Sequence, residues 1–356
     1  MKKIRVLVVE DSLTVRKHLL GVLAADPDIE VIGEAEDGKR AIELCQKHRP
    51  DVITMDMMLP VMSGLAATEY IMAHCPTPIL VVSSSVNRGE LFKTYDALAA
   101  GAVDVFEKMN GTQTDGAWER DFVAAMKLVA KIRVITHPRG RLRGSSQAEF
   151  PSPEPLQPVA GSPFSAKLEL VVIGASTGGP AAIVEVLRGL PPTFQLPVLF
   201  VMHINEPFGR AFADWLDGQT PRRVAYPKDG DPVALAAGRV VMAPGGHHLV
   251  VRDGRLRFTM DPERHSCRPS IDVLFDSVAR EYGRSALACL LTGMGRDGAA
   301  GLLAIRKAGG VTIAQDEATS IIYGMPREAV LLGAADSVLP LGEIGPAIAA
   351  ANEARG

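Results

Sequence analysis

The stretch LELVVIGASTGGPAAIVEVL, residues 168–187, indicates the fold of the second half of the chain. Its apolar run ends at Gly174, a serine follows two residues later, and a helical pattern begins after Gly178. A buried strand, a glycine turn and a helix in this order are typical of a parallel sheet covered by helices. The turn is either a nucleophile elbow that carries Ser176 or a glycine loop that holds a phosphate.

The residues of this turn favour the elbow only weakly. Residues 174–178 fit the pattern G-x-S-x-G, but serine is also a common helix N-cap. A dinucleotide fingerprint would need glycine in place of Ser176, and the next strand, PVLFVMHI, ends at His203 instead of a ribose-binding acid. The residues around the turn must therefore decide between the two interpretations.

The rest of this half continues the alternation of strands and helices. Further strand candidates are PVLFVMHI, GRVVMAP, HHLVVRDG, ALACLLTGMG and GVTIAQ. The pattern VVMAPGGHHLVVRDGRLRFTM predicts an antiparallel hairpin inserted in an otherwise parallel sheet. We therefore expect a Rossmann-like domain with an antiparallel hairpin.

The first half predicts a second doubly wound domain, of the flavodoxin-like type. The strand candidates are IRVLVV, IEVIGEA, DVITMD, PILVVSS and AVDVFEK. Helical patterns fall at 12–25, with Ser12 as the capping residue, and near 39–48, 65–74, 89–100 and 117–133. Five strands, each followed by a helix, predict a parallel sheet with helices on both faces.

A linker separates the two halves. Residues 136–167 contain six prolines, several serines and glycines, and little apolar periodicity. We therefore expect a first domain over residues 1–135, a solvated tether over 136–167 and a second domain over 168–356.

Composition excludes several classes of function. The 356 residues carry a formal net charge of −3, which gives no support for a nucleic-acid partner or a membrane surface. No apolar run approaches the roughly 20 residues of a spanning helix, so we expect no membrane insertion. The four cysteines show no CxxC spacing, which favours reduced thiols in a cytoplasmic protein.

Polar side chains follow the strands of the first half at one edge of its sheet. Glu10 and Asp11 end the first strand, Asp56 the third, Ser83 the fourth, and the fifth runs into Lys108. Carboxylates this close repel one another unless a cation neutralises them, and oxygen ligands of this kind suit Mg²⁺. Asp56 would then be a nucleophile towards a phosphoryl donor, with Ser83 and Lys108 holding the phosphoryl oxygens.

The motifs VLVVEDS, DVITMDMMLPVMSG, VVSS and AGAVDVFEK resemble the receiver domain of two-component response regulators. The resemblance implies phosphorylation of Asp56 by a histidine kinase, Mg²⁺ held by Glu10, Asp11 and Asp56, and a switch that involves Ser83 and Lys108. The chain departs from the family at Val105, where an aromatic residue is usual, and at Met109, where proline is usual.

A serine becomes a nucleophile only with a base and an acid that orients the base. His203 ends the strand after Ser176, and Asp297 lies in CLLTGMGRDGAAGLLAI, another strand, glycine turn and helix. The carboxyl ends of parallel strands share an edge, where a triad can assemble. The backbone N–H groups of TGMG, Met294 foremost, offer an oxyanion hole.

Other residues remain as alternatives at this point. The other base candidates lie in a predicted turn and a polar loop, and the other acid candidates in a turn and on one predicted helix. These are His247, His248 and His265 for the base, and Asp229, Asp231, Asp272 and Asp276 for the acid.

Six motifs extend a resemblance over almost the whole chain. VVIGASTGGP, VMHI, APGGHHL, RPSIDVLFDSVA, LLTGMGRDGAAGLLAIRKAGG and TIAQDEATSIIYGMPREAV are similar to the methylesterase domain of chemotaxis response regulator protein-glutamate methylesterases. The resemblance implies Ser176 as nucleophile, His203 as base and Asp297 as orienting acid, with Thr177 beside the oxyanion donor Met294. It also implies a substrate, the glutamate methyl esters on the cytoplasmic helices of a methyl-accepting chemoreceptor, with deamidation of certain receptor glutamines and no cofactor for the ester reaction.

Two departures from this family fall near the site. HINEPFG, residues 203–209, replaces the usual HMPPGF, and Cys267 replaces a histidine that is common before RPS. Two other classes of function stay open: a phosphorylation-controlled binding module that holds methylated helices without cleaving them, and a nucleotide-binding regulator.

Overall fold

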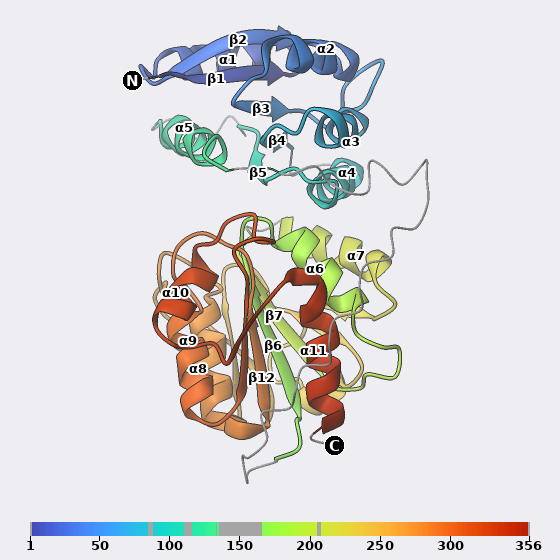
Figure 1. Cartoon of the computed structure of the whole chain (residues 1–356), viewed down its shortest axis with the longest axis vertical. Helices are drawn as coiled ribbons and strands as arrows, with labels where there is room; N and C mark the ends of the chain where they lie inside the picture. The colour runs from blue at the N-terminus through green and yellow to red at the C-terminus, as the bar shows by residue number, and fades with distance from the viewer. Residues whose placement is uncertain are drawn as a thin grey trace.

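The computed structural model contains two α/β units, one above the other along the long axis (Figure 1). It describes residues 2–84, 88–109, 116–132, 134, 166–204 and 208–354. Most of the expected linker over 136–167 lies outside these residues, as do Arg133 and the middle of the HINEPFG loop. Among the described residues, no helix combines the length and the apolar character that crossing a bilayer requires.

The first unit is a five-stranded parallel sheet with helices on both faces. Its strands pair in the order β2-β1-β3-β4-β5, which confirms the flavodoxin-like prediction. The strands are β1 (Ile4–Val9), β2 (Ile29–Ala35), β3 (Val52–Met55), β4 (Ile79–Ser83) and β5 (Asp104–Glu107). The helices are α1 (Leu13–Ala24), α2 (Gly38–His48), α3 (Gly64–His74), α4 (Arg88–Ala99) and α5 (Ala117–Val129).

Side-chain capping fixes the start of two helices in this unit, but not the start of α1. Asp37 caps α2 by accepting from Arg40 N, and Ser63 caps α3 by accepting from Ala66 N. Ser12 occupies the expected N-cap position of α1 but makes no side-chain capping bond. Its own backbone N–H donates instead to Glu10 Oε1, at 3.2 Å, so the first loop is fixed by the carboxylate before it.

The second unit contains a seven-stranded parallel sheet in the order β14-β13-β12-β6-β7-β9-β8. The strands are β6 (Leu170–Ala175), β7 (Val198–Met202), β8 (Val224–Ala225), β9 (Val240–Met242), β12 (Ala286–Leu290), β13 (Val311–Gln315) and β14 (Ser337–Leu339). The helices are α6 (Gly179–Arg188), α7 (Phe208–Gln219), α8 (Ile271–Glu281), α9 (Ala299–Lys307), α10 (Met325–Leu331) and α11 (Leu341–Ala354). Because β12, β6 and β7 are neighbours and parallel, the loops that follow them meet at one edge.

The antiparallel hairpin exists, but not inside the main sheet. It is formed by β10 (His248–Arg252) and β11 (Arg255–Thr259), which make a separate two-stranded sheet. The preceding strand, β9, pairs in parallel with β7 and β8. The hairpin leaves the sheet because it packs on α8, where Ser277 Oγ accepts from the backbone N of Val251 at 3.0 Å.

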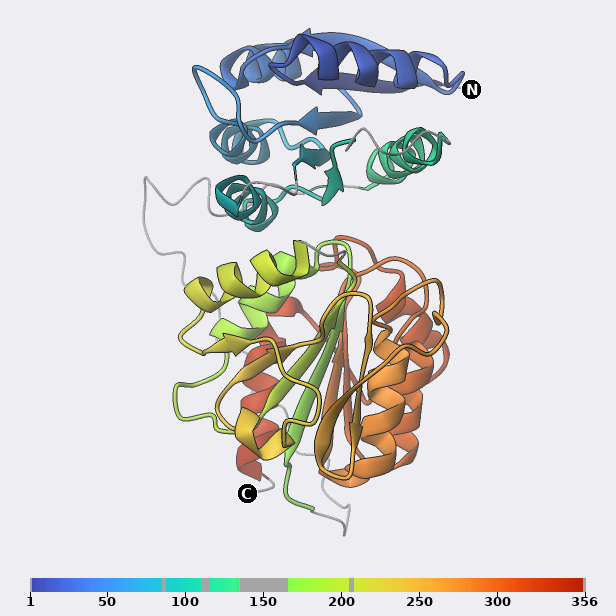
Figure 2. The same cartoon turned by 180° about the vertical axis from the view of Figure 1, so that it is seen from behind.

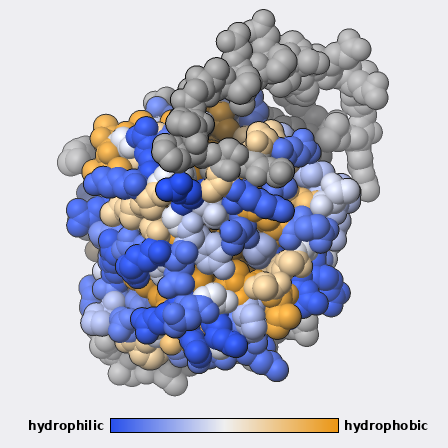
Figure 3. Space-filling model, turned by 90° about the horizontal axis from the view of Figure 1, so that it is seen from below, coloured by the Kyte–Doolittle hydropathy of each residue, from blue (hydrophilic) through white to orange (hydrophobic). Residues whose placement is uncertain are grey.

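The first unit docks on the second through α4. Tyr95 is fully buried, and its hydroxyl donates to the carbonyl oxygen of Phe208, at the start of α7, at 2.6 Å. Trp215 Nε1 donates to Asp96 Oδ1 at 2.8 Å, and the rings of Tyr95, Phe212 and Trp215 each pack against the other two. The first unit therefore stands over the carboxyl edge of the larger sheet (Figures 1 and 2). The opposite face of the molecule is largely hydrophilic, with small separate hydrophobic areas (Figure 3).

Candidate active site and phosphoacceptor site

Ser176 lies directly after β6, in a turn that is packed too closely for larger residues. Its backbone N donates to Thr292 O at 3.0 Å, and its carbonyl accepts from Gly179 N at 2.7 Å. Gly178 is the N-cap of α6 and has φ +80°, a left-handed conformation that favours glycine. A Cβ on Gly293 would lie 2.7 Å from the Cβ of Ser176, so the neighbouring loop also approaches the serine by its backbone.

His203 and Asp297 lie at the same edge and form a close pair. Nε2 of His203 is 2.8 Å from Oδ2 of Asp297. Three further donors hold the carboxylate at the start of α8: Ser270 Oγ at 2.7 Å, Ile271 N at 2.7 Å and Asp272 N at 3.1 Å. An acid fixed by four donors orients the imidazole that it contacts.

The electrostatics of the pair follow from this contact. Burial alone would lower the pKa of His203, but hydrogen bonds to Asp297 and Cys267 outweigh it and raise the pKa to about 9. Burial would raise the pKa of Asp297, but the hydrogen bond and charge of His203 hold it below its usual value. Both shifts describe an imidazolium and a carboxylate that stabilise each other.

The second nitrogen of His203 faces a thiol. Sγ of Cys267 lies 3.7 Å from Nδ1, and no hydrogen bond joins Ser176 to His203 within the described part of the chain. Ser176, His203 and Cys267 line one pocket of about 410 Å³. Sequence reasoning singled out Cys267 only as a departure from a family pattern, because residue type alone does not show which side chain lies beside the base.

The receiver-like unit forms the other wall of this pocket. Its lining includes Asp104 and Phe106 from β5 and Trp118 from α5. Thr177, next to Ser176, donates through Oγ1 to Asp104 Oδ2 at 2.9 Å. Burial raises the pKa of Asp104, and its hydrogen bonds to Val105 and Thr177 offset only part of this. The two units therefore meet at the candidate active site itself.

Met294, the expected oxyanion donor, lies in the exposed turn after β12. Its side chain is 55% exposed, so it does not belong to the core. A Cβ added at Gly324 would lie 3.2 Å from the Cα of Met294 and 2.6 Å from the carbonyl oxygen of Gly293. Close backbone contacts therefore hold this turn beside the serine.

The alternative histidines occupy other roles. His248 follows the predicted turn and is fully buried, and its Nδ1 accepts from Ser270 N at 3.1 Å. Nε2 of His265 lies 3.1 Å from Oδ2 of Asp272, a fully buried carboxylate whose Oδ1 accepts from Gly301 N at 2.7 Å. His247 contacts the carbonyl of Gly245 in its own turn.

Three acidic side chains of the first unit lie close together at the carboxyl edge of its sheet. Glu10, Asp11 and Asp56 each place a carboxylate oxygen within 4.8 Å of the others, and Lys108 Nζ lies 3.0 Å from both Glu10 Oε2 and Asp56 Oδ2. Burial, and then the charge of Asp56, raise the pKa of Glu10 to about 7. Three oxygen donors, of which Asp11 is exposed, match the incomplete ligand set that Mg²⁺ takes when it also holds water and phosphate oxygens.

Ser83 turns towards α4 in this structure. Its hydroxyl donates to Glu90 Oε1 at 3.1 Å, and Thr94 Oγ1 lies 2.9 Å from Ser83 Oγ. The side chain of Val105 is partly buried and packs against the core. It places an aliphatic group where an aromatic ring is usual in the family. Met109 likewise packs at the edge of the core around α5.

Comparisons with known proteins decide the family. The profile of the family described as CheB methylesterase matches residues 171–348, and that of the response regulator receiver domain matches residues 6–114. The chain belongs to the CheB methylesterase family. This finding confirms the resemblance seen in the sequence motifs.

Relatives in the CheB methylesterase family extend over both units. A protein-glutamate methylesterase/protein-glutamine glutaminase 2 of Anaeromyxobacter dehalogenans is 44% identical over 96% of this chain and 95% of its own length. A protein-glutamate methylesterase/protein-glutamine glutaminase of Nitrosospira multiformis is 42% identical over 97% and 96%. The crystal structure of the Thermotoga maritima CheB methylesterase catalytic domain is 33% identical, covers 52% of this chain and 99% of its own, and has a TM-score of 0.49.

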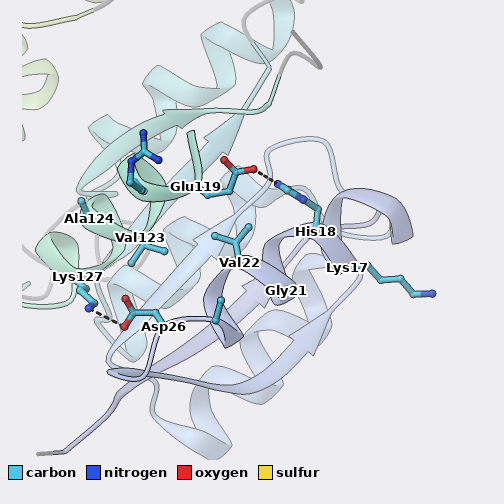
Figure 4. A pocket seen from close by; sticks show the side chains of 11 residues that line it. Lys17, His18, Gly21, Val22, Asp26, Glu119, Val123, Ala124 and Lys127 are labelled. Atoms are coloured by element: carbon cyan, nitrogen blue, oxygen red, sulfur yellow. Dashed lines mark ion pairs between the residues drawn. The ribbon is translucent and has the colours of Figure 1, made fainter. Parts of the chain in front are cut away.

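A second cavity, of about 810 Å³, lies between α1 and α5 of the receiver unit (Figure 4). Ion pairs cross it between His18 and Glu119, at 3.7 Å, and between Lys127 and Asp26, at 2.8 Å. Neither the phosphoacceptor cluster nor the candidate triad contributes to its lining.

Proposed function

We propose that the chain hydrolyses glutamate methyl esters on the cytoplasmic helices of a methyl-accepting chemoreceptor and releases methanol, with deamidation of certain receptor glutamines. Phosphorylation of the receiver domain by a histidine kinase regulates this activity, which serves adaptation in a chemotaxis-like pathway in the cytoplasm. The observation that carries the proposal is the pair His203–Asp297, at 2.8 Å, in which His203 lines one pocket together with Ser176.

The proposed ester reaction has two steps. Ser176 Oγ attacks the ester carbonyl and passes its proton to His203, whose Nδ1 is the nitrogen that Asp297 leaves free. The backbone N–H of Met294 stabilises the oxyanion. The same proton then goes to the departing methoxide, methanol leaves, and water hydrolyses the acyl-enzyme with His203 again as the base.

The proposed phosphoryl transfer uses the acidic cluster. Asp56 attacks the phosphoryl group of the kinase histidine, and Lys108, which already contacts Asp56, pairs with the phosphoryl oxygens. Glu10, Asp11 and Asp56 would hold Mg²⁺, which neutralises charge on the transferred group. Ser83 would turn from Glu90 to a phosphoryl oxygen.

The contact between the units supports regulation by covering. If the Ser83 side chain rotates towards the phosphoryl group, it loses its hydrogen bond to Glu90. Glu90 lies on α4, one helical turn before Thr94 and Tyr95. Tyr95 holds the start of α7, close behind His203 in the chain. In this proposal a change at Asp56 reaches the start of α7 through Ser83, Glu90 and Tyr95.

The decisive experiment measures methanol release from methylated receptor membranes by the full chain, with and without a small phosphodonor. We expect the Ser176→Ala variant to lose activity by a factor of roughly 10⁴–10⁶ while its circular dichroism spectrum is unchanged. A fluorophosphonate probe should label the wild-type chain at Ser176. Full turnover by this variant would remove Ser176 from the mechanism, and absence of methanol in every condition would refute the function.

A further inference from the structure

Thr292 lies where three loops meet beside Ser176. The first loop follows β6 and carries Ser176 and Thr177, the second follows β12 and carries Thr292 itself, and the third runs from β13 to α10. Thr292 is 1% exposed, although a hydroxyl is costly to bury without partners. The hydrogen bonds of Thr292 therefore account for a polar side chain at this position.

The hydroxyl of Thr292 joins the first loop to the third. Its oxygen accepts from the backbone N of Ile322 at 2.9 Å, and its proton is donated to the carbonyl oxygen of Thr177 at 3.0 Å. The carbonyl oxygen of Ile322 is a more distant acceptor, at 3.3 Å. The methyl group of Thr292 faces Gly178, where an added Cβ would lie 3.2 Å from it. One buried side chain thus fixes the distance between the serine turn and the segment before α10.

The backbone of Thr292 binds to the same loops. Its carbonyl oxygen accepts from Ser176 N at 3.0 Å, and its own N donates to Oε1 of Gln315 at 2.8 Å. Gln315 is fully buried and donates through Nε2 to the carbonyl oxygen of Thr319 at 2.8 Å. Because the N–H of Ser176 is used in this bond, an oxyanion that develops at the serine must find its donors elsewhere.

Two backbone N–H groups beside the serine have no acceptor among the described residues, those of Thr177 and Met294. Their directions are fixed, because the carbonyl and the N–H of a planar trans peptide point opposite ways. The carbonyl oxygen of Ser176 accepts from the first N–H of α6 at 2.7 Å, so the N–H of Thr177 points away from that helix. The carbonyl oxygen of Gly293 accepts from two backbone N groups at the start of α10, at 2.9 and 3.2 Å, so the N–H of Met294 points away from α10.

We propose that Thr292 is the positioning residue of the oxyanion hole, because its hydroxyl sets the separation between the N–H groups of Thr177 and Met294. The inference rests on the proposed function for the ester substrate and adds a buried residue that acts on the rate through these two groups. Removing the hydroxyl would leave the carbonyl of Thr177 and the N–H of Ile322 without this partner in a buried place. A shift of about 1 Å in a catalytic group costs on the order of 10² in rate, so the loosened donors would lose much of their effect on the transition state.

The test compares three variants of the full chain with the wild type, in the presence of a small phosphodonor. Thr292→Val keeps the shape and removes the hydroxyl, and Thr292→Ser keeps the hydroxyl and removes the methyl group. Thr312→Val is the matched control. Thr312 is also buried, and its hydroxyl donates to Oδ2 of Asp336 at 2.9 Å and accepts from Asp336 N at 3.0 Å, near the amino end of β13 and away from the serine.

We expect Thr292→Val to lower kcat for methanol release by roughly 10² and to leave KM within about twofold, because an oxyanion donor acts on the transition state rather than on the bound ester. Thr292→Ser should restore most of this kcat. Thr312→Val should lose a similar amount of thermal stability and keep the wild-type kcat. A wild-type kcat in Thr292→Val, an equal loss of kcat in Thr312→Val, or a Thr292→Ser chain as slow as Thr292→Val would each overturn the proposal.

A second readout separates this inference from the proposed function. A fluorophosphonate forms a tetrahedral adduct whose oxygen occupies the oxyanion hole, so Thr292→Val should slow the labelling of Ser176 by about tenfold or more, and Thr312→Val should not. If the wild type is labelled but releases no methanol, the proposed substrate fails, and the labelling rates of the two valine variants decide the role of Thr292. Equal labelling rates in these variants would then overturn the inference, and a wild type that takes no label would overturn both.

Discussion

At the scale of single residues, the raised pKa of His203 predicts how ester hydrolysis depends on pH. The base must be neutral to accept the proton of Ser176, so kcat/KM for methanol release should rise with pH through a midpoint near 9. Because the hydrogen bond to Cys267 is one cause of the raised pKa, Cys267→Ala should move this midpoint to lower pH. The measurement is the pH profile of methanol release by both chains. An unchanged midpoint would show that the thiol does not act on the imidazole.

A second prediction at this scale concerns Ser270, which joins the acid to a helix start. Its hydroxyl donates to Asp297 at 2.7 Å and accepts from Val273 N as the N-cap of α8. Ser270→Ala should therefore lower the free energy of unfolding by about 1 kcal/mol and also lower kcat, because the carboxylate loses one of its four donors. Denaturant unfolding and methanol release measure the two effects. A loss of stability with full kcat would limit Ser270 to capping.

At the scale of elements, close packing of β6 against the start of α8 positions the carboxylate of Asp297. A Cβ on Gly174 would lie 2.3 Å from Cγ2 of Ile271, the residue whose backbone N holds Asp297. Gly174→Ala should push α8 outward, cost about 1–3 kcal/mol and lower methanol release. Gly21→Ala, with open space around the position in α1, is the matched control and should be neutral or stabilising. A fully active Gly174→Ala would mean that α8 can shift without disturbing the acid.

The order of the parallel strands explains how much of the site the sequence could predict. Ser176, His203 and Asp297 were placed at one edge because each follows a strand, and neighbouring parallel strands end together. The thiol of Cys267 could not be placed in this way, since it lies in a loop whose course depends on packing between residues far apart in sequence. The hairpin itself is predicted by its pattern, but its separation from the main sheet is not: its strands alternate as any strand does, and only packing on α8 shows that they leave the main sheet.

At the scale of the whole molecule, the proposed regulation makes the contact of α4 with α7 the place where the balance between a covered and an open active site is set. The hydroxyl of Tyr95 donates to Phe208 O, and Trp215 donates to Asp96. Each such bond contributes about 0.5–1.5 kcal/mol, so Tyr95→Phe should raise the open population of the unphosphorylated chain about two- to tenfold. We expect methanol release without phosphodonor to rise by the same factor.

The control for this prediction is another tyrosine of the receiver unit. Tyr70 on α3 accepts from Gln46 and lies away from the contact with the second unit, so Tyr70→Phe should leave unphosphorylated activity unchanged. With phosphodonor, Tyr95→Phe and wild type should converge, because in the proposed regulation phosphorylation already favours the open state. If Tyr95→Phe instead lowers activity both with and without phosphodonor, α4 supports the active form, and regulation by covering fails for this chain.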